Sequence, residues 1–170
     1  MSTNNGLNIS IEIADIDCVV NAANEGLRMG SGVCGAIFKG AGPDKLTEAC
    51  RKLHGCPTGS AVITPGFNLK AKYIIHAVGP VWSGSKEDQE LLAGCYRESL
   101  ERAKENDCHS IAFPLISAGI FGCPVDQAWE HALRGCREWI EQNPDYDIKI
   151  IFAVRRQEIK DKGEAILSSL

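Results

Sequence analysis

Two asparagines and a group of glycines lie close together in the first quarter of the chain. Asn21 and Asn24 follow an apolar run that ends at Val20, and residues 30–35 read GSGVCG. The apolar run is typical of a buried strand, and glycines let backbone N–H groups approach a ligand closely. A helix is expected from Ala36, so the positive end of its dipole faces the same point. The stretch therefore favours an anion, most simply a phosphate.

The glycines also match G-x-G-x-x-G, the motif of dinucleotide-binding dehydrogenases. In that motif the glycines follow the strand directly, and an acidic residue closes a second strand about 20 residues later. Here residues 22–29 separate Asn21 from Gly30, and the strand expected at 60–64 runs into Pro65 without a carboxylate. This disfavours a dinucleotide-binding enzyme. A P-loop ATPase is disfavoured because GxxxxGK[ST] does not occur in the sequence.

Strand and helix patterns alternate along the rest of the chain. Apolar runs and alternation predict strands near 9–13, 16–20, 60–64, 73–78, 111–114 and 148–154. Helical periodicity predicts helices from 36 to the Gly42-Pro43 break and near 44–53, 88–105, 124–141 and 159–170. The alternation indicates one domain over residues 1–170, with an α/β fold: a three-layer α/β/α sandwich around a central mixed, largely parallel sheet.

A second glycine loop, SAGIFG at 117–122, follows the strand expected at 111–114. Ligands of open α/β sheets bind at the carboxyl ends of strands. Both loops follow strands, so both are expected to border one cleft.

Composition narrows the classes of function. The net charge of −4 argues against a protein that holds nucleic acid by charge alone. The chain has no apolar run of 18 residues, and its polar start, MSTNNGLN, has no apolar signal core, so we expect neither a membrane span nor secretion. We expect a cytoplasmic monomer.

Eight cysteines are scattered along the chain without a CxxC pair. Without a signal peptide they are expected to be reduced, and most fall within apolar patterns, which predicts buried thiols. Cys50, His54 and Cys56 lie close in sequence, but a structural zinc site needs four ligands with a recognisable spacing. Neither a metal nor a cofactor is expected.

Several segments together resemble one known family. VNAAN at 20–24, followed by GAIFKGAG at 35–42, is similar to the macro domain, an ADP-ribose-binding fold. GCPTGSAVIT at 55–64, AKYIIHAVGPVW at 71–82 and AFPLISAGIFG at 112–122 resemble further family motifs, in family order. The similarity extends over about residues 9–155 and looks closest to bacterial and mitochondrial proteins that hydrolyse ADP-ribosyl esters and O-acetyl-ADP-ribose. It implies ADP-ribose, or a protein carrying it, as the binding partner.

The resemblance also implies roles for individual residues. The two loops would hold the diphosphate, Asn24 would orient the distal ribose, Phe121 would pack on that ribose, and Arg155 would lie beside the adenine. Strand capping by Asn24, core packing by Phe121 and plain solvent exposure of Arg155 remain alternatives. The full set of expected ligand contacts is Asn21, Ala22, Asn24, Gly30, Ser31, Gly32, Val33, Ser117, Ala118, Gly119, Ile120, Phe121 and Arg155.

The sequence departs from the hydrolytic relatives at two positions. They carry aspartate and histidine where this chain has Cys34 and Phe38. A thiol is a poor general base at neutral pH, and losing a positioned base costs on the order of 10²–10⁴ in rate. Catalysis would then rest on Asn24, with Cys34 in place of the aspartate and a substrate phosphate oxygen activating the water. A non-catalytic ADP-ribose reader is the alternative.

A third departure concerns the adenine end of the ligand. The family places an aspartate that binds the adenine amino group at the position of Ser10. Glu12 and Asp15 are the nearest carboxylates that could substitute for it.

Overall fold

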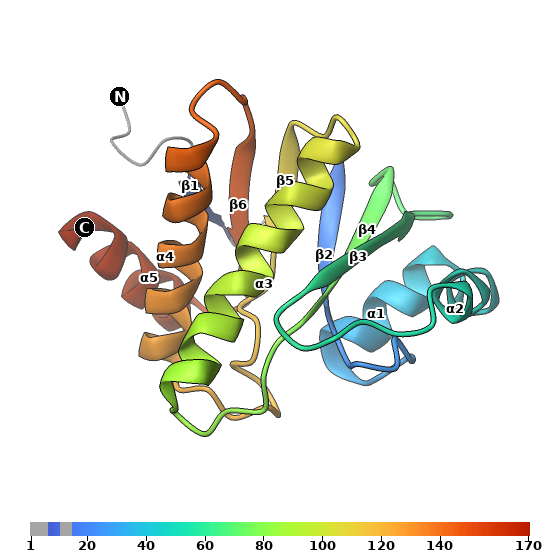
Figure 1. Ribbon diagram of the computed structural model, residues 1–170, viewed down its shortest axis with the longest axis horizontal. Coiled ribbons are helices and arrows are strands. Elements are labelled where there is room, and N and C mark those ends of the chain that lie inside the picture. The colour runs from blue at the N-terminus through green and yellow to red at the C-terminus, as the bar shows by residue number, and fades with distance from the viewer. Residues whose placement is uncertain (1–6, 11–14) are drawn as a thin grey trace.

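The computed structural model describes residues 7–10 and 15–170 (Figure 1). Within these residues the chain forms one six-stranded sheet and five helices. The strands are β1 (Leu7–Ser10), β2 (Cys18–Ala23), β3 (Ala61–Pro65), β4 (Tyr73–Val78), β5 (Ser110–Phe113) and β6 (Lys149–Ala153). The helices are α1 (Gly32–Ala41), α2 (Pro43–Lys52), α3 (Lys86–Glu105), α4 (Val125–Gln142) and α5 (Gln157–Ser169).

The sheet has the strand order β1-β6-β5-β2-β4-β3. Every neighbouring pair is parallel except β3 and β4, which are antiparallel. The central strands are apolar and buried on both faces because helices cover both sides, as expected for a parallel sheet. The predicted α/β/α sandwich with a mixed, largely parallel sheet is confirmed.

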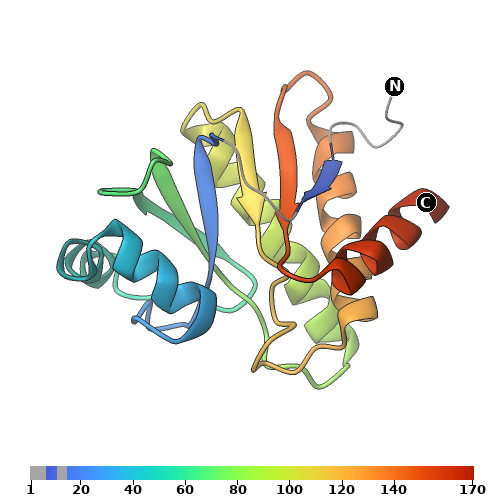
Figure 2. The ribbon, with the colours of Figure 1, turned by 180° about the vertical axis from the view of Figure 1, so that it is seen from behind.

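Two apolar cores lie on opposite faces of the sheet. Under α3 and α4, the rings of Tyr96, Phe113 and Phe152 pack together, with centroids 4.8 Å apart for Tyr96–Phe113 and 5.6 Å for Phe113–Phe152. Such aromatic pairs contribute about 0.5–1.5 kcal/mol each beyond their area burial. In the view of Figure 2, α1 and α2 lie in front of the sheet, and the fully buried Phe38 and Leu46 belong to the second core beneath them. The helix that follows the first glycine loop is thus anchored by its own apolar side chains.

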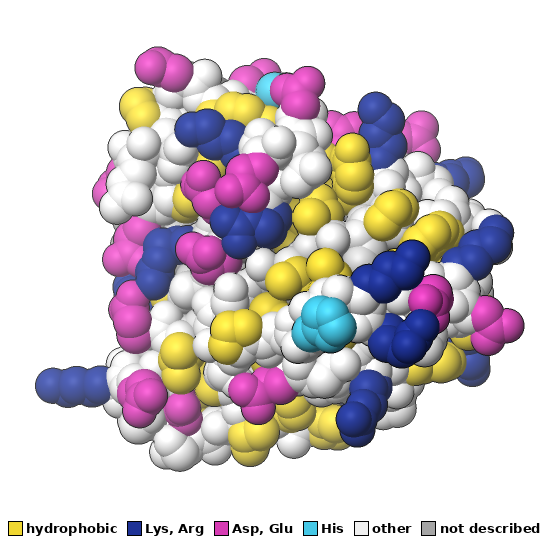
Figure 3. Space-filling view, turned by 45° about the vertical axis from the view of Figure 1, so that its right-hand side comes forward, with side chains coloured by type: hydrophobic (Ala, Val, Ile, Leu, Met, Phe, Trp, Pro, Cys, Tyr) yellow, Lys and Arg dark blue, Asp and Glu magenta, His cyan; other side chains and the backbone are white. Residues whose placement is uncertain are grey.

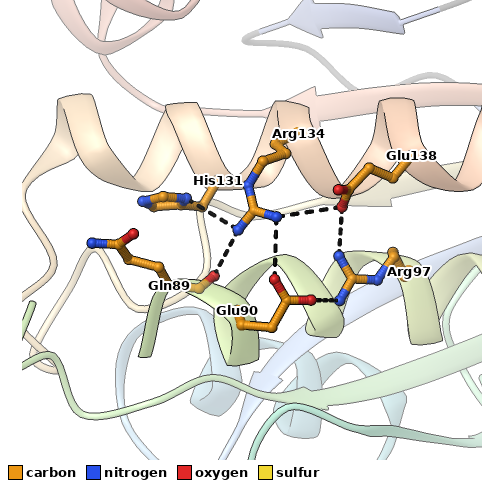
Figure 4. Close-up of polar contacts among 6 residues, drawn as sticks. All are labelled: Gln89, Glu90, Arg97, His131, Arg134 and Glu138. Carbon is orange, nitrogen blue, oxygen red and sulfur yellow. Dashed lines mark hydrogen bonds and ion pairs between the residues drawn. The ribbon is translucent and has the colours of Figure 1, made fainter. Parts of the chain in front are cut away.

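A network of ion pairs joins α3 to α4 at the surface (Figure 4). Arg97 contacts Glu90 and lies 2.6 Å from Glu138, and Arg134 lies 3.3 Å from Glu90 and 3.5 Å from Glu138. Arg134 also lies 3.4 Å from the imidazole of His131. These side chains are partly exposed, so each pair contributes at most about 1 kcal/mol. The network links the two helices at the surface, above the core that their buried side chains share.

Most predicted boundaries agree with the structure, but two do not. The first helix begins at Gly32 rather than Ala36, so most of the glycine motif lies within its first turn. The second strand, predicted near 16–20, runs from Cys18 to Ala23, because its residues as far as Ala23 pair with β4. The strand predicted at 9–13 is seen as β1 up to Ser10, and its remainder lies outside the described residues.

All eight cysteines are buried and none forms a disulfide, which confirms the expectation of buried thiols. No helix within residues 7–10 and 15–170 is both long and apolar enough to cross a membrane.

Candidate functional site

The predicted ligand residues lie at one end of the sheet. β6, β5 and β2 are consecutive and parallel, so the segments after them emerge at the same edge, at the bottom of Figure 1. Asn24 and residues 30–33 follow β2, residues 117–121 follow β5, and Arg155 follows β6. From β5 the chain continues through α4 to β6 on one side, and from β2 it continues through α1 and α2 to β3 and β4 on the other side. The end of the sheet between β5 and β2 is therefore a topological switch point, where α/β folds bind ligands.

The first glycine loop ends in an uncapped helix. Among the described residues, no side-chain hydrogen bond from Ser31 caps the N-terminus of α1. The first N–H groups of a helix lack intrahelical partners, so those of α1 are available to a bound anion. Gly30, Ser31 and Gly32 are exposed, and Gly32 has a φ of +59°. A Cβ on Gly35 would lie 2.6 Å from the Gly30 carbonyl oxygen, so the loop can fold back on the helix only with glycine there.

The second loop is held from behind by backbone and side-chain bonds. Ser117 has a φ of +67°, and its hydroxyl donates to the Pro80 carbonyl at 2.8 Å. The Trp82 N–H donates to the Phe121 carbonyl at 2.8 Å. The loop is thereby fixed to the segment that leaves β4. Phe121 is half-buried, whereas Ile120 is 91% exposed at the tip of the loop.

Asn24 closes a turn with its side chain. Its amide N–H donates to the Arg28 carbonyl at 2.9 Å, and its amide oxygen accepts the Arg28 N–H at 2.9 Å. An amide has two donor hydrogens and two acceptor lone pairs, so each end retains capacity for one further partner. Orientation of a ribose by Asn24 remains a prediction; the structure adds that this side chain also holds the turn rigid.

Cys34 and Phe38 lie on the inner side of α1. Cys34 is 8% exposed, and its Sγ lies 3.8 Å from the Arg28 carbonyl oxygen. Phe38 is fully buried in the core under α1 and α2. The thiol therefore lies next to the Asn24 turn, and neither position supplies a carboxylate or an imidazole.

Asn21 does not point its side chain at the cleft. Its Nδ2 lies 3.1 Å from Nδ1 of His76, whose Nε2 lies 3.0 Å from the Thr64 hydroxyl and 3.9 Å from Cys50 Sγ. Burial lowers the pKa of His76 from 6.5 to about 4. Sequence patterns gave no sign of this network, because its members are 12 to 55 residues apart and His76 is a lone histidine in an apolar strand. Ala22, the next expected contact, is half-buried within β2.

The adenine end would lie at the β1–β6 side of the sheet. Ser10 ends β1 and pairs with Ala153 of β6, and the exposed Arg155 follows two residues later. Asp15 is exposed, and Glu12 lies outside the described residues. Arg155 follows β6 at this edge of the sheet, and its place beside the adenine remains a prediction.

Other features of the surface lie apart from these loops. The described residues contain no group of three or more His, Cys, Asp or Glu that could hold a metal ion. An open groove of about 560 Å³ runs between residues 58–60 and α3, away from the predicted ligand contacts. The glycine loops, with their unpaired helix N-terminus at a switch point, remain the better candidate for a charged ligand.

Comparison with known proteins identifies the family to which the chain belongs. Residues 20–132 match the family model described as Macro domain, and the chain belongs to the macro domain family. It is 57% identical over 123 residues to the macro domain-containing protein RSc0334 of Ralstonia nicotianae, covering 72% of this chain and 71% of that protein. Human ADP-ribose glycohydrolase MACROD2 is 47% identical over 146 residues, which cover 85% of this chain and 34% of that protein.

Solved structures agree with this assignment. The macrodomain of Oceanobacillus iheyensis with ADP superposes with a TM-score of 0.85 at 35% identity, covering 92% of this chain and 85% of that one. A Trypanosoma brucei macrodomain in complex with ADP-ribose gives a TM-score of 0.82 at 36% identity, covering 90% and 64%. The resemblance noted in the sequence is confirmed for family and fold.

Proposed function

We propose that the chain binds ADP-ribose in the crevice between the two glycine loops and hydrolyses ADP-ribosyl esters. The observation that carries the proposal is the position of both loops at the carboxyl ends of adjacent parallel strands, with the uncapped N-terminus of α1 at the switch point. Relatives support it, since one is named an ADP-ribose glycohydrolase and another is bound to ADP-ribose.

Backbone groups would supply most of the diphosphate binding. Residues 30–33 and 117–121 present N–H groups from two sides, and the α1 dipole adds positive potential. The distal ribose would then lie on the Asn24 side and the adenine beside Arg155. No lysine is required for this arrangement.

Hydrolysis would add water across the ester and release ADP-ribose and a carboxylic acid, either acetate from O-acetyl-ADP-ribose or a protein Asp or Glu side chain. Asn24 would orient the ribose, and a phosphate oxygen of the substrate would accept the proton of the attacking water. Because positions 34 and 38 carry neither a carboxylate nor an imidazole, turnover should be slower by about 10²–10⁴ than with a positioned base.

A non-catalytic ADP-ribose reader is the second candidate. It is favoured by Cys34, whose thiol is buried, and by Phe38, whose ring has no group that can transfer a proton. A reader needs the same two loops but no activated water.

A turnover assay on two substrates separates the candidates. O-acetyl-ADP-ribose and a protein mono-ADP-ribosylated on glutamate are incubated with wild type, Cys34→Asp and Asn24→Ala, and ADP-ribose affinity is measured for each variant. The hydrolase predicts slow wild-type turnover that falls further in Asn24→Ala and rises in Cys34→Asp. Binding without any wild-type turnover at high enzyme concentration would contradict the hydrolase, and activity that appears only in Cys34→Asp would establish the reader.

A further inference from the structure

Charge is distributed very unevenly along this acidic chain. Residues 24–82, which form the loop after β2, α1, α2, β3, β4 and the segment after β4, contain seven Lys and Arg but only three Asp and Glu. The whole chain has 18 basic and 22 acidic residues, so 11 basic and 19 acidic residues lie elsewhere. This region therefore carries a net charge of +4, and dark blue side chains gather on the right of Figure 3.

Part of this basic side adjoins the candidate site. The Cys56 N–H donates to the Glu25 carbonyl at 2.9 Å, which joins the segment after α2 to the turn closed by Asn24. The segment that follows the C-terminal end of α2, where Arg51 and Lys52 lie, therefore contacts the turn that contains Arg28. All three of these side chains belong to exposed residues. We call Arg28, Arg51 and Lys52 the basic rim.

Two of the three cations of the basic rim, Arg28 and Lys52, take part in no ion pair among the described residues. Arg51 forms a two-point contact with Glu48, with N–O distances of 2.7–3.0 Å, and the two side chains are 74% and 50% exposed. By contrast, Arg97, Arg102 and Arg134 outside this region each contact two carboxylates. The single Glu48 carboxylate therefore offsets one of the three positive charges of the rim, and an exposed pair of this kind is weak.

Helix stability explains only part of this pattern. Basic residues in the last turn of a helix offset its dipole, which accounts for Arg51 and Lys52. It does not account for Arg28 in the preceding loop or for the scarcity of acidic residues over the whole region. Clustered charge of one sign is the usual basis for attracting a partner of opposite charge.

We propose that the basic rim binds an acidic polypeptide segment, rich in Asp and Glu, that carries the ADP-ribosyl group. This inference rests on the proposed function. The rim lies next to Asn24, the side at which the distal ribose and its attached protein would be placed. Carboxylates flanking a modified glutamate would then meet Arg51 and Lys52 while the nucleotide occupies the crevice. The rim would thus recognise the protein residues that flank the modified glutamate. The two glycine loops, which hold the nucleotide, would not contact these residues.

The test compares two peptides that carry ADP-ribose through a non-hydrolysable linkage, one flanked by Asp and Glu and one by Ser and Gln. Binding is measured for wild type and for Arg51→Gln/Lys52→Gln. The control, Lys149→Gln/Lys162→Gln, changes the net charge equally on β6 and α5. Arg28 is not substituted, so that the hydrogen bonds between its backbone and the Asn24 side chain stay the same in every variant.

We expect wild type to bind the acidic peptide about 10-fold more tightly than the neutral one at low salt, since each exposed pair contributes up to about 5-fold. The rim variant should lose most of this preference, the control should keep it, and both should bind free ADP-ribose as wild type does. Higher salt should also reduce the preference.

Equal affinity for the two peptides, or equal loss of preference in both double variants, would overturn the proposal. Tighter binding of an ADP-ribosylated oligonucleotide than of the acidic peptide, lost in the rim variant, would overturn it in favour of nucleic acid. If wild type fails to bind free ADP-ribose, the proposed function itself fails, which distinguishes the two ideas.

Discussion

Acidification should destabilise this protein through one buried histidine. The pKa of His76 is about 4 in the folded chain, lowered by burial from 6.5, so between these values the unfolded chain binds a proton that the folded chain does not. Stability is therefore fully present above pH 6.5 and falls as the pH decreases. One pKa unit corresponds to about 1.36 kcal/mol, and the cost through this group is about 2 kcal/mol at pH 5 and about 3 kcal/mol at pH 4.

Urea unfolding of wild type and His76→Gln at pH 7 and pH 5 isolates this effect. Glutamine retains hydrogen-bonding groups near Asn21 and Thr64 but does not titrate. The loss of unfolding free energy between the two pH values should be smaller in the variant by about 2 kcal/mol. Other titrating groups affect both proteins equally and cancel in this difference. Identical pH dependence in the two proteins would refute the assignment of a buried, neutral His76.

Three further predictions concern other parts of the fold. The pKa of His109 is raised by the Asp147 carbonyl and by Asp107, so its contribution is present at low pH and lost as the pH rises; His109→Gln should steepen the fall in stability on acidification, measured by the same urea series. Gly35→Ala should displace the Gly30 carbonyl, cost about 1–3 kcal/mol in thermal or urea unfolding, and weaken ADP-ribose binding at least 10-fold in calorimetry; unchanged binding would contradict a role for the first loop. Tyr96→Phe removes the hydroxyl that accepts the Ile116 N–H at 2.9 Å, and leaving that buried group unpaired should cost about 1–3 kcal/mol in urea unfolding, whereas a neutral substitution would show that another acceptor replaces it.

The helices and the site loops could be predicted from sequence because their signals are local. The apolar stripe of α3 and the Gly42-Pro43 break each depend on residues a few positions apart, and both agree with the structure. The two glycine loops could be assigned to one edge because each follows a strand. The sequence predicts the start of α1 at Ala36 instead of Gly32, because glycines, which are poor helix formers, occupy the first turn.

Contacts between distant segments could not be predicted in this way. The antiparallel placement of β3 depends on a turn and on packing against α3, and the Asn21–His76 bond joins residues 55 positions apart. The two hydrogen bonds between the Asn24 side chain and the Arg28 backbone are local. The sequence alone does not show whether the Asn24 amide bonds to the backbone or to a ligand. These features follow from the packed fold rather than from any short pattern.

Calorimetric titration of the wild-type protein shows whether the site between the two glycine loops holds ADP-ribose. ADP-ribose, ADP and AMP are titrated in turn under the same conditions. We expect micromolar affinity for ADP-ribose, corresponding to about −8 kcal/mol, with weaker binding of ADP and much weaker binding of AMP. No detectable heat with ADP-ribose, or equal affinity for ADP-ribose and AMP, would contradict it.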